Sequence, residues 1–268
     1  FSAAPGDEDE KPEPGRPKEP RPPRRQGLNR FVWDGRHVPP TPIEIDPPKE
    51  ERGYPLPLGP LVPPGSYRVR LQFGDEVEVV AFEIAQDPRN PATQADLDAR
   101  YRHAQLLWRR LSELNTGVNT IRELKRQLER WSPAVATRAS NGAVEEGGEI
   151  ASAASSLREA LSEVERELVQ VDPKGSRRLS NRDRLDGKLQ LLLTHATFPS
   201  RPTDAAVAVA DELSRQLHGA LARLDALLGG QVANFNQLVR LAEAPALAPR
   251  LAVTQVSPAA SAAESGKV

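Results

Sequence analysis

The sequence predicts an α+β protein in which a small β-sandwich precedes an antiparallel four-helix bundle with long first and last helices. Apolar residues alternate with polar ones in the first third of the chain, as they do in half-buried strands. Over the rest they recur at spacings of three and four, as they do in amphipathic helices. We predict four parts: a disordered, Pro-rich, charged linker (1–26), the β-sandwich (27–90), the helical bundle (91–243) and a disordered tail (244–268).

Residues 1–26 combine charge with proline, with acids first (Asp7 to Glu10) and bases later (Arg21 to Arg25). Such a segment buries too little apolar surface to offset the entropy of ordering, and its prolines favour extended polyproline II stretches. A solvated linker is the interpretation we favour over a recognition tail. The Ala/Pro/Ser-rich residues from Ala244 onward are expected to be loose as well.

The β-module is predicted to hold three or four strands. The apolar residues Leu28, Phe31 and Trp33 within Gly27–Asp34 are spaced as in a half-buried strand, which predicts a first strand. A proline-dense loop follows from Pro39 to Pro64, and it cannot be a central strand because proline lacks the N–H donor.

A hairpin is predicted after that loop, turning at Gly74-Asp75. Its first strand has an apolar face of Tyr67, Val69, Leu71 and Phe73, and its second strand returns through Val77, Val79, Ala81–Phe82 and Ile84. With so few strands, the module is expected to form a small sandwich or half-sandwich that is stable only when packed against another surface. We expect Trp33, Tyr67 and Phe73 to cover apolar surface of the first long helix or of another domain.

The first helix is predicted from two heptad series, Leu97, Ala104, Leu111 and Val118, and Leu107, Leu114, Ile121 and Leu128. The register continues past Gly117, so one helix of about 38 residues, ending at Trp131–Pro133, is expected. A flexible loop is expected from there to Gly148.

Three further helices complete the predicted bundle. The second follows the stripe from Ile150 to Val171 and stops at Asp172–Gly175, and a short third one carries Leu185, Leu189, Leu192 and Ala196. The fourth begins at Thr203 as N-cap, follows a stripe from Ala206 to Leu238 and bends at Gly229-Gly230.

Composition excludes several classes of function. With 36 basic and 37 acidic residues, no overall field attracts nucleic acid or a membrane surface, and no apolar run reaches the ~18–20 residues that cross a bilayer. The absence of cysteine removes disulfides, thiolate nucleophiles and cysteine zinc sites. The chain also contains no methionine, so we expect Phe1 to follow a cleavage or a chosen boundary.

No catalytic, cofactor-binding or metal-binding residues are predicted. The four histidines, His37, His103, His195 and His218, show no metal-ligand spacing. His37 is expected in a polar loop and His195 near a helix end. Glu159, Glu163, Glu165 and Glu167 are placed on the solvated side of their helix, and no nucleophile-elbow or phosphate-loop motif occurs.

Seven arginines raise the question of a basic patch: Arg122, Arg126, Arg130, Arg177, Arg178, Arg182 and Arg184. Acidic residues are interspersed with most of them, so salt-bridged helix surfaces are expected. The Arg177–Arg184 cluster is opposed by Asp183 alone, and we interpret it as a loop that caps the bundle rather than as a ligand site.

Two stretches of the β-module resemble a known family. Gly27–Asp34 and Pro64–Leu71 fit the pattern GxNxxxWD…PGxYxVxL of Ig-like modules in flagellar hook-capping proteins and in the C-terminal part of bacterial sortilin-like β-propeller proteins. The second family is the closer match, because Asp87-Pro88-Arg89 leads into Thr93–Leu97 as its junction does.

The resemblance continues through the bundle and covers about residues 27–243. Arg184–Leu189 resembles that family's RLNNKL stretch, with Gly187 in place of Asn, and Arg201-Pro202-Thr203 with Phe235-Asn236 resembles its last helix. Members carry a large upstream propeller of bacterial-neuraminidase-type repeats. The resemblance therefore implies an Ig-like β-module, an upstream β-propeller as partner and an extracytoplasmic location, and it transfers no catalytic residue.

The sequence thus predicts a non-catalytic accessory or scaffold region, with no cofactor, that packs against the propeller and presents its bundle to a protein partner. Two alternatives remain open. The region could support a secreted glycoside hydrolase whose active site lies in the propeller, or it could be a self-assembling coiled coil.

Overall fold

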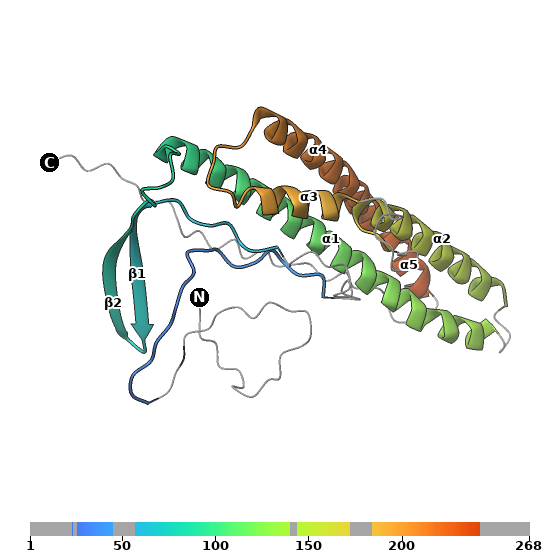
Figure 1. The fold of residues 1–268 in the computed structure, drawn as a ribbon. Helices are drawn as coiled ribbons and strands as arrows, with labels where there is room; N and C mark the ends of the chain where they lie inside the picture. The colour runs from blue at the N-terminus through green and yellow to red at the C-terminus, as the bar shows by residue number, and fades with distance from the viewer. Residues whose placement is uncertain (1–22, 24–25, 45–56, 140–143, 172–183, 242–268) are drawn as a thin grey trace, which may run out of the picture.

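The computed structural model confirms the α+β class and describes residues 23, 26–44, 57–139, 144–171 and 184–241 (Figure 1). The regular elements are β1 (Gly65–Phe73), β2 (Glu76–Ile84), α1 (Gln94–Ala139), α2 (Val144–Leu168), α3 (Leu185–His195), α4 (Asp204–Leu227), the π-helical η3 (Leu228–Val232) and α5 (Ala233–Leu241). The predicted linker, apart from residues 23 and 26, and the predicted tail lie outside the described residues.

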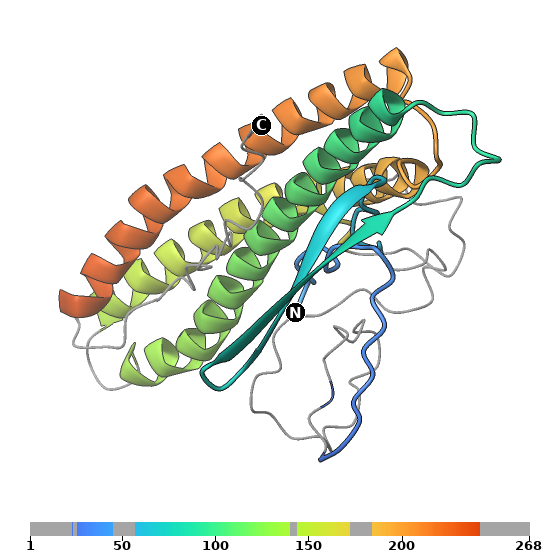
Figure 2. The ribbon, with the colours of Figure 1, turned by 90° about the vertical axis from the view of Figure 1, so that its left-hand side faces the viewer.

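The helices form an elongated bundle with three columns (Figures 1 and 2). One column is α1, whose 46 residues span about 69 Å. The second consists of α2, antiparallel to α1, followed by α3 where α2 ends, and the third is the continuous run α4–η3–α5. The long first and last helices are confirmed. The cross-section holds three helices rather than the expected four, because α2 and α3 succeed each other along α1.

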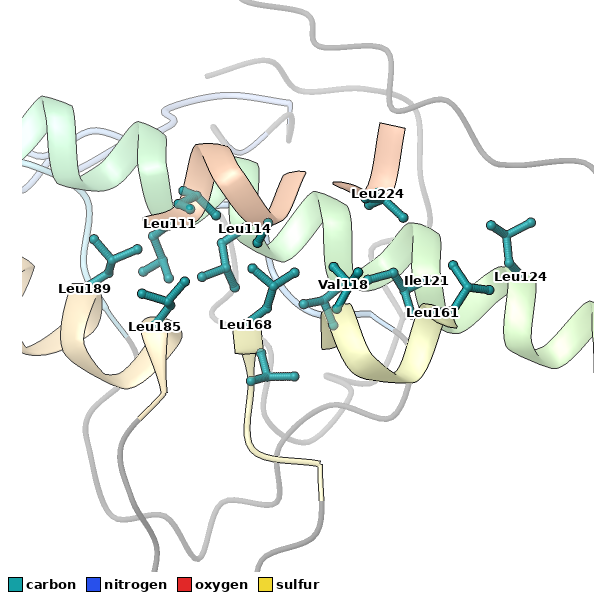
Figure 3. Packing of buried hydrophobic residues seen from close by; sticks show 14 of the residues in the cluster. Leu111, Leu114, Val118, Ile121, Leu124, Leu161, Leu168, Leu185, Leu189 and Leu224 are labelled. Carbon is teal, nitrogen blue, oxygen red and sulfur yellow. The ribbon is translucent and has the colours of Figure 1, made fainter. Parts of the chain in front are cut away.

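The core lies along the inward faces of the three columns (Figure 3). Both predicted heptad series of α1 are buried, and Leu124 joins them. Leu161 and Leu168 of α2 and then Leu185 of α3 lie along α1 in turn, so α2 and α3 together make up the second column (Figure 3). The heptad pattern therefore predicted this contact face correctly.

The N-terminus of α1 is fixed by a reciprocal cap. Thr93 Oγ1 accepts a hydrogen bond from the Asp96 N–H at 3.2 Å, and Asp96 Oδ2 accepts from the Thr93 N–H at 3.1 Å. These interactions satisfy N–H groups that have no partner within the helix. The predicted cap of α4 is also confirmed, since Thr203 Oγ1 accepts from the Ala206 N–H at 3.1 Å.

The predicted end of the first helix was wrong. α1 continues through Pro133 to Ala139, and α2 already begins at Val144, so most of the expected flexible loop is helical. A helical proline removes one hydrogen bond, but three helix-favouring alanines follow Pro133 within six residues and can continue the helix. Gly147 and Gly148 lie near the start of α2 and do not interrupt it.

The expected bend at Gly229-Gly230 is the π-helical turn η3, within an otherwise continuous helix. A π turn holds more residues per turn than an α-helix, so it changes the direction in which the following side chains point. Val232, at the end of η3, and Phe235 and Val239 of α5 are buried. The last helix thus keeps contact with α2 through α5.

The β-region differs most from the prediction. The described residues contain a two-stranded antiparallel sheet, β1–β2, and Gly27–Asp34 forms no strand in it. A β-sandwich is therefore not present in the described part of the chain. The described residues of the proline-dense loop, 39–44 and 57–64, lie outside the sheet, as expected, apart from an isolated bridge between Arg36 and Leu61.

The register of the hairpin divides its apolar residues between two faces. Tyr67 is paired with Phe82 and Val69 with Val80, so these four share a face, together with Leu71 and Phe73 further along. Val77, Val79 and Ala81 instead stand opposite Gln72, Arg70 and Arg68, on the second face. The second strand therefore does not present the single apolar face expected of it.

Candidate interaction surfaces

The outer part of the hairpin exposes apolar side chains on both faces. On one face Phe73 is 83% exposed and Leu71 63%, and on the other Val79 is 52% exposed. Figure 1 shows β1 and β2 extending away from the helices, with the turn at Gly74 at the far end. This surface, which we call the hairpin tip (Val69–Val80), is apolar and in contact with solvent.

The base of the hairpin carries an aromatic cluster. Trp33 stands edge-on to Tyr67 and to Phe82, each with ring centroids 6.3 Å apart. Such edge-to-face pairs add to the energy of burial. Within the described residues, Trp33 and Tyr67 pack with Phe82 of the hairpin itself, and the ring of Phe73 is open to solvent. The expectation that these residues cover a surface of another domain stays a prediction.

Polar contacts fix this cluster to the backbone. The Trp33 indole N–H donates to the Arg36 carbonyl at 2.7 Å, and the Tyr67 hydroxyl donates to the Pro63 carbonyl at 2.5 Å. These contacts give the residues of the Trp-Asp and Pro-Gly-x-Tyr motifs a structural role at the base of the hairpin.

Residues 35–37 and 59–62, which we call the neck, join the hairpin base to α1. The His37 N–H donates to the Pro60 carbonyl at 3.0 Å, and the Val62 N–H donates to the Gly35 carbonyl at 2.9 Å. The buried Arg100 of α1 donates from Nη2 to the Leu61 carbonyl at 3.1 Å. Gly59 is required here, since a Cβ at that position would lie 1.9 Å from the His37 carbonyl oxygen.

Residues 38–44, which we call the strap, lie along α1. The Trp108 indole N–H donates to the Val38 carbonyl at 3.0 Å. Asn115 Nδ2 donates to the Thr41 carbonyl at 2.7 Å, and Ser112 Oγ accepts from the Thr41 N–H at 3.2 Å.

Asn119 makes the last contacts in this row. Its Nδ2 donates to the Pro42 carbonyl and its Oδ1 accepts from the Glu44 N–H, both at 2.9 Å. Trp108, Ser112, Asn115 and Asn119 therefore form a ladder of side chains, one turn of α1 after another, and the strap runs parallel to the helix.

The sequence reasoning missed this ladder, although a signal was present. Tyr101, Trp108 and Asn115 recur every seven residues outside the two core series. Two large aromatic residues in a third heptad line indicate a second contact face on the helix. The proline-dense segment after His37, interpreted as a loop, supplies the chain that covers this face.

His37 lies in a loop, as expected, at the junction of the neck and the strap, but its side chain is half-buried rather than solvated. Its Nε2 is 2.6 Å from the Tyr101 hydroxyl oxygen, and its ring faces those of Tyr101 and Trp108. Burial lowers the pKa of His37 and raises the pKa of Tyr101. The native contact thus favours neutral imidazole.

We therefore predict that acid weakens the native state through His37. Its pKa in the folded chain lies below the unfolded value of 6.5, so the stabilisation is complete above pH 6.5 and is lost as pH falls through the folded pKa. The free energy of unfolding of His37→Phe should fall less steeply below pH 6.5 than that of the parent, measured by urea denaturation at several pH values. A His218→Gln variant, changed at an exposed site, should behave as the parent does. Equal slopes in the His37 variant and the parent would contradict the prediction.

The other histidines lie apart from one another. His103 of α1 is half-buried, which lowers its pKa, while the nearby Asp211 acts in the opposite direction. His195 ends α3, as predicted, and both it and His218 are exposed. In the described residues no group of three or more His, Cys, Asp and Glu side chains could hold a metal ion.

The four glutamates of α2 do not share the predicted environment. Glu159, Glu163 and Glu167 are exposed, whereas Glu165 is 2% exposed, so the prediction for it was wrong. Its carboxylate contacts Arg122 Nε at 2.6 Å and Lys125 Nζ at 2.8 Å. Glu165 lies beside Leu161 and Leu168 on the helix surface, at the edge of the apolar stripe, and therefore faces α1.

The structure describes some of the seven arginines that raised the question of a basic patch, but not all of them. Arg122 is salt-bridged as predicted, Arg126 is exposed, and the side chain of Arg130 lies outside the described residues. The cluster interpreted as a bundle cap also lies outside them, except for Arg184. Within the described part of the chain, the buried Arg184 Nε has no hydrogen-bond partner.

Comparison with known proteins gives no relatives. No protein-family model matches the chain. No curated protein and no solved structure matches it either. In the described part of the chain, none of the helices combines the length and apolar character that membrane spanning requires. The resemblance to sortilin-like propeller proteins therefore stays a prediction.

Proposed function

We propose that this chain is a non-catalytic interaction module whose hairpin tip docks on a neighbouring domain of the same polypeptide. The observation that carries the proposal is the exposed apolar surface of β1 and β2, with Phe73 83% exposed. Contiguous apolar patches on soluble proteins usually mark an interaction site.

The isolated hairpin also leaves main-chain groups without partners. β1 and β2 are nine residues each, and no further strand of the described chain pairs with either outer edge. Two-stranded hairpins are marginally stable alone, and open edges accept additional strands. A docked domain would cover the apolar side chains and protect these edges.

Charge at the hairpin tip indicates the character of the docking surface. Glu78 stands opposite Leu71 and Glu76 opposite Phe73, so two carboxylates border the apolar face. A complementary surface would be apolar at its centre and basic at its margin, since opposite charges favour correct orientation.

The resemblance of Gly27–Asp34 and Pro64–Leu71 to Ig-like modules suggests which domain this is. We infer an upstream β-propeller as the neighbour and an Ig-like sandwich as the form that the β-module takes when docked. The Tyr67 hydroxyl supports the comparison, because it returns to a carbonyl four residues upstream, a contact similar to the tyrosine corner of Ig folds. An extracytoplasmic location follows from the same resemblance.

Docking is expected to slow the hydrogen exchange of the backbone amides in the hairpin. The chain and the domain that precedes it, produced separately and mixed, should form a complex in which the amides of β1 and β2 exchange more slowly than in the free chain. Leu71→Asp with Phe73→Asp should weaken the complex at least tenfold, because each charge would enter an apolar contact. Titration followed by hydrogen exchange and size-exclusion chromatography measures both effects.

A matched control separates docking from general loss of solubility. Val209→Asp changes an apolar side chain that is 48% exposed on α4, so it should leave the affinity unchanged. Hairpin amides that are equally protected in the free chain and in the mixture would contradict the proposal. Turnover of glycan, nucleotide or peptide substrates by the chain alone would contradict its non-catalytic part.

A further inference from the structure

The second surface of interest is the ladder on α1, which is occupied by the chain's own strap. We propose that Trp108, Ser112, Asn115 and Asn119 form a binding site for an extended, proline-containing peptide segment, and that the strap fills this site until a partner segment of the same kind replaces it. The proposal is independent of docking at the hairpin tip, because it uses a different surface.

The side chains of the ladder bind main-chain groups of the strap. Each of the four side chains has at least one hydrogen bond with a carbonyl or N–H group of residues 38–44. Ser112 Oγ, which accepts from the Thr41 N–H, also donates to the Trp108 carbonyl of its own helix. Main-chain recognition tolerates different side chains, provided that the segment is extended and offers its groups at the same spacing. Prolines at positions 39, 40 and 42 keep the segment extended and remove N–H groups that would otherwise need partners.

The strap is an incomplete occupant of the site. Asn119 uses both ends of its amide, on the Pro42 carbonyl and on the N–H two residues later. Asn115 uses only Nδ2, on the Thr41 carbonyl, and its buried Oδ1 has no hydrogen-bond partner within the described chain. Because an unsatisfied buried oxygen is costly, a segment that also offers an N–H to Asn115 would bind better than the strap.

The strap can leave without opening the bundle core. Thr41, Pro42 and Glu44 are exposed, while Pro40 is buried and Ile43 is only partly buried where it packs against the core. Displacement would thus expose the ladder, which is polar apart from the Trp108 ring. The leucines on the other face of α1 would stay covered by α2, α3 and α4.

The test uses the full chain and a synthetic peptide with the sequence of residues 36–46. A Thr41→Pro, Glu44→Pro variant removes the two strap N–H donors to Ser112 and Asn119 and should loosen the strap. This variant should bind the labelled peptide at least tenfold more tightly than the parent chain, measured by fluorescence anisotropy. The Trp108 indole N–H resonance, assigned with Trp108→Phe, should report release of the strap and its replacement by the peptide.

A ladder variant provides the matched control. Adding Asn115→Ala and Asn119→Ala to the strap variant should abolish peptide binding, while circular dichroism confirms that the bundle stays helical. Equal peptide affinity with and without the two asparagines would overturn the proposal. So would a strap variant whose Trp108 indole keeps the parent's resonance, or one that releases the strap and fails to bind the peptide at millimolar concentration.

Discussion

Replacing Glu165 with alanine is expected to lower the free energy of unfolding by about 3–5 kcal/mol, because it removes a buried carboxylate that contacts both Arg122 and Lys125 in the interface between α1 and α2. Arg122 Nε and Lys125 Nζ lie 2.6 Å and 2.8 Å from the Glu165 carboxylate. Their side chains are only 13% and 19% exposed, so water can replace the lost carboxylate only in part. Urea denaturation followed by circular dichroism measures the change.

The neighbouring Glu167 offers the matched control for this experiment. It also pairs across helices, with Arg223 of α4, but both side chains are about half exposed. Exposed ion pairs contribute about 0–1 kcal/mol, so Glu167→Ala should be nearly neutral. If the Glu165 and Glu167 variants lose equal stability, burial does not set the importance of the Glu165 cluster.

Glu165 also shows where prediction from sequence reaches its limit. The heptad pattern correctly predicted the buried faces of α1, because apolar periodicity reports which side of a helix leaves water. It placed Glu165 in solvent because a charged residue beside an apolar stripe is usually exposed. Only the three-dimensional structure brings Arg122 and Lys125, forty or more positions away, into contact with it.

The candidate surfaces were predictable to different degrees. The strands of the hairpin follow from period-two alternation and the Gly74-Asp75 turn, but the sequence could not show that no described strand covers them. The strap was harder to find, because its prolines exclude a central strand without indicating where the segment binds. Its contacts with Asn115 and Asn119 join residues more than 70 positions apart and carry no local pattern.

Replacing Phe235 with alanine is expected to cost about 3–5 kcal/mol, since it is among the largest fully buried side chains and its removal leaves a cavity between α5 and α2. Phe235 follows the π turn η3, so its burial depends on the direction that this turn gives to the last helix. Phe198→Ala is the matched control, because Phe198 is 61% exposed and its removal should cost less than about 0.5 kcal/mol. Chemical denaturation of both variants measures the difference. Equal, small losses would show that α5 is not held against α2 in solution, and that the bundle is completed by α4 alone.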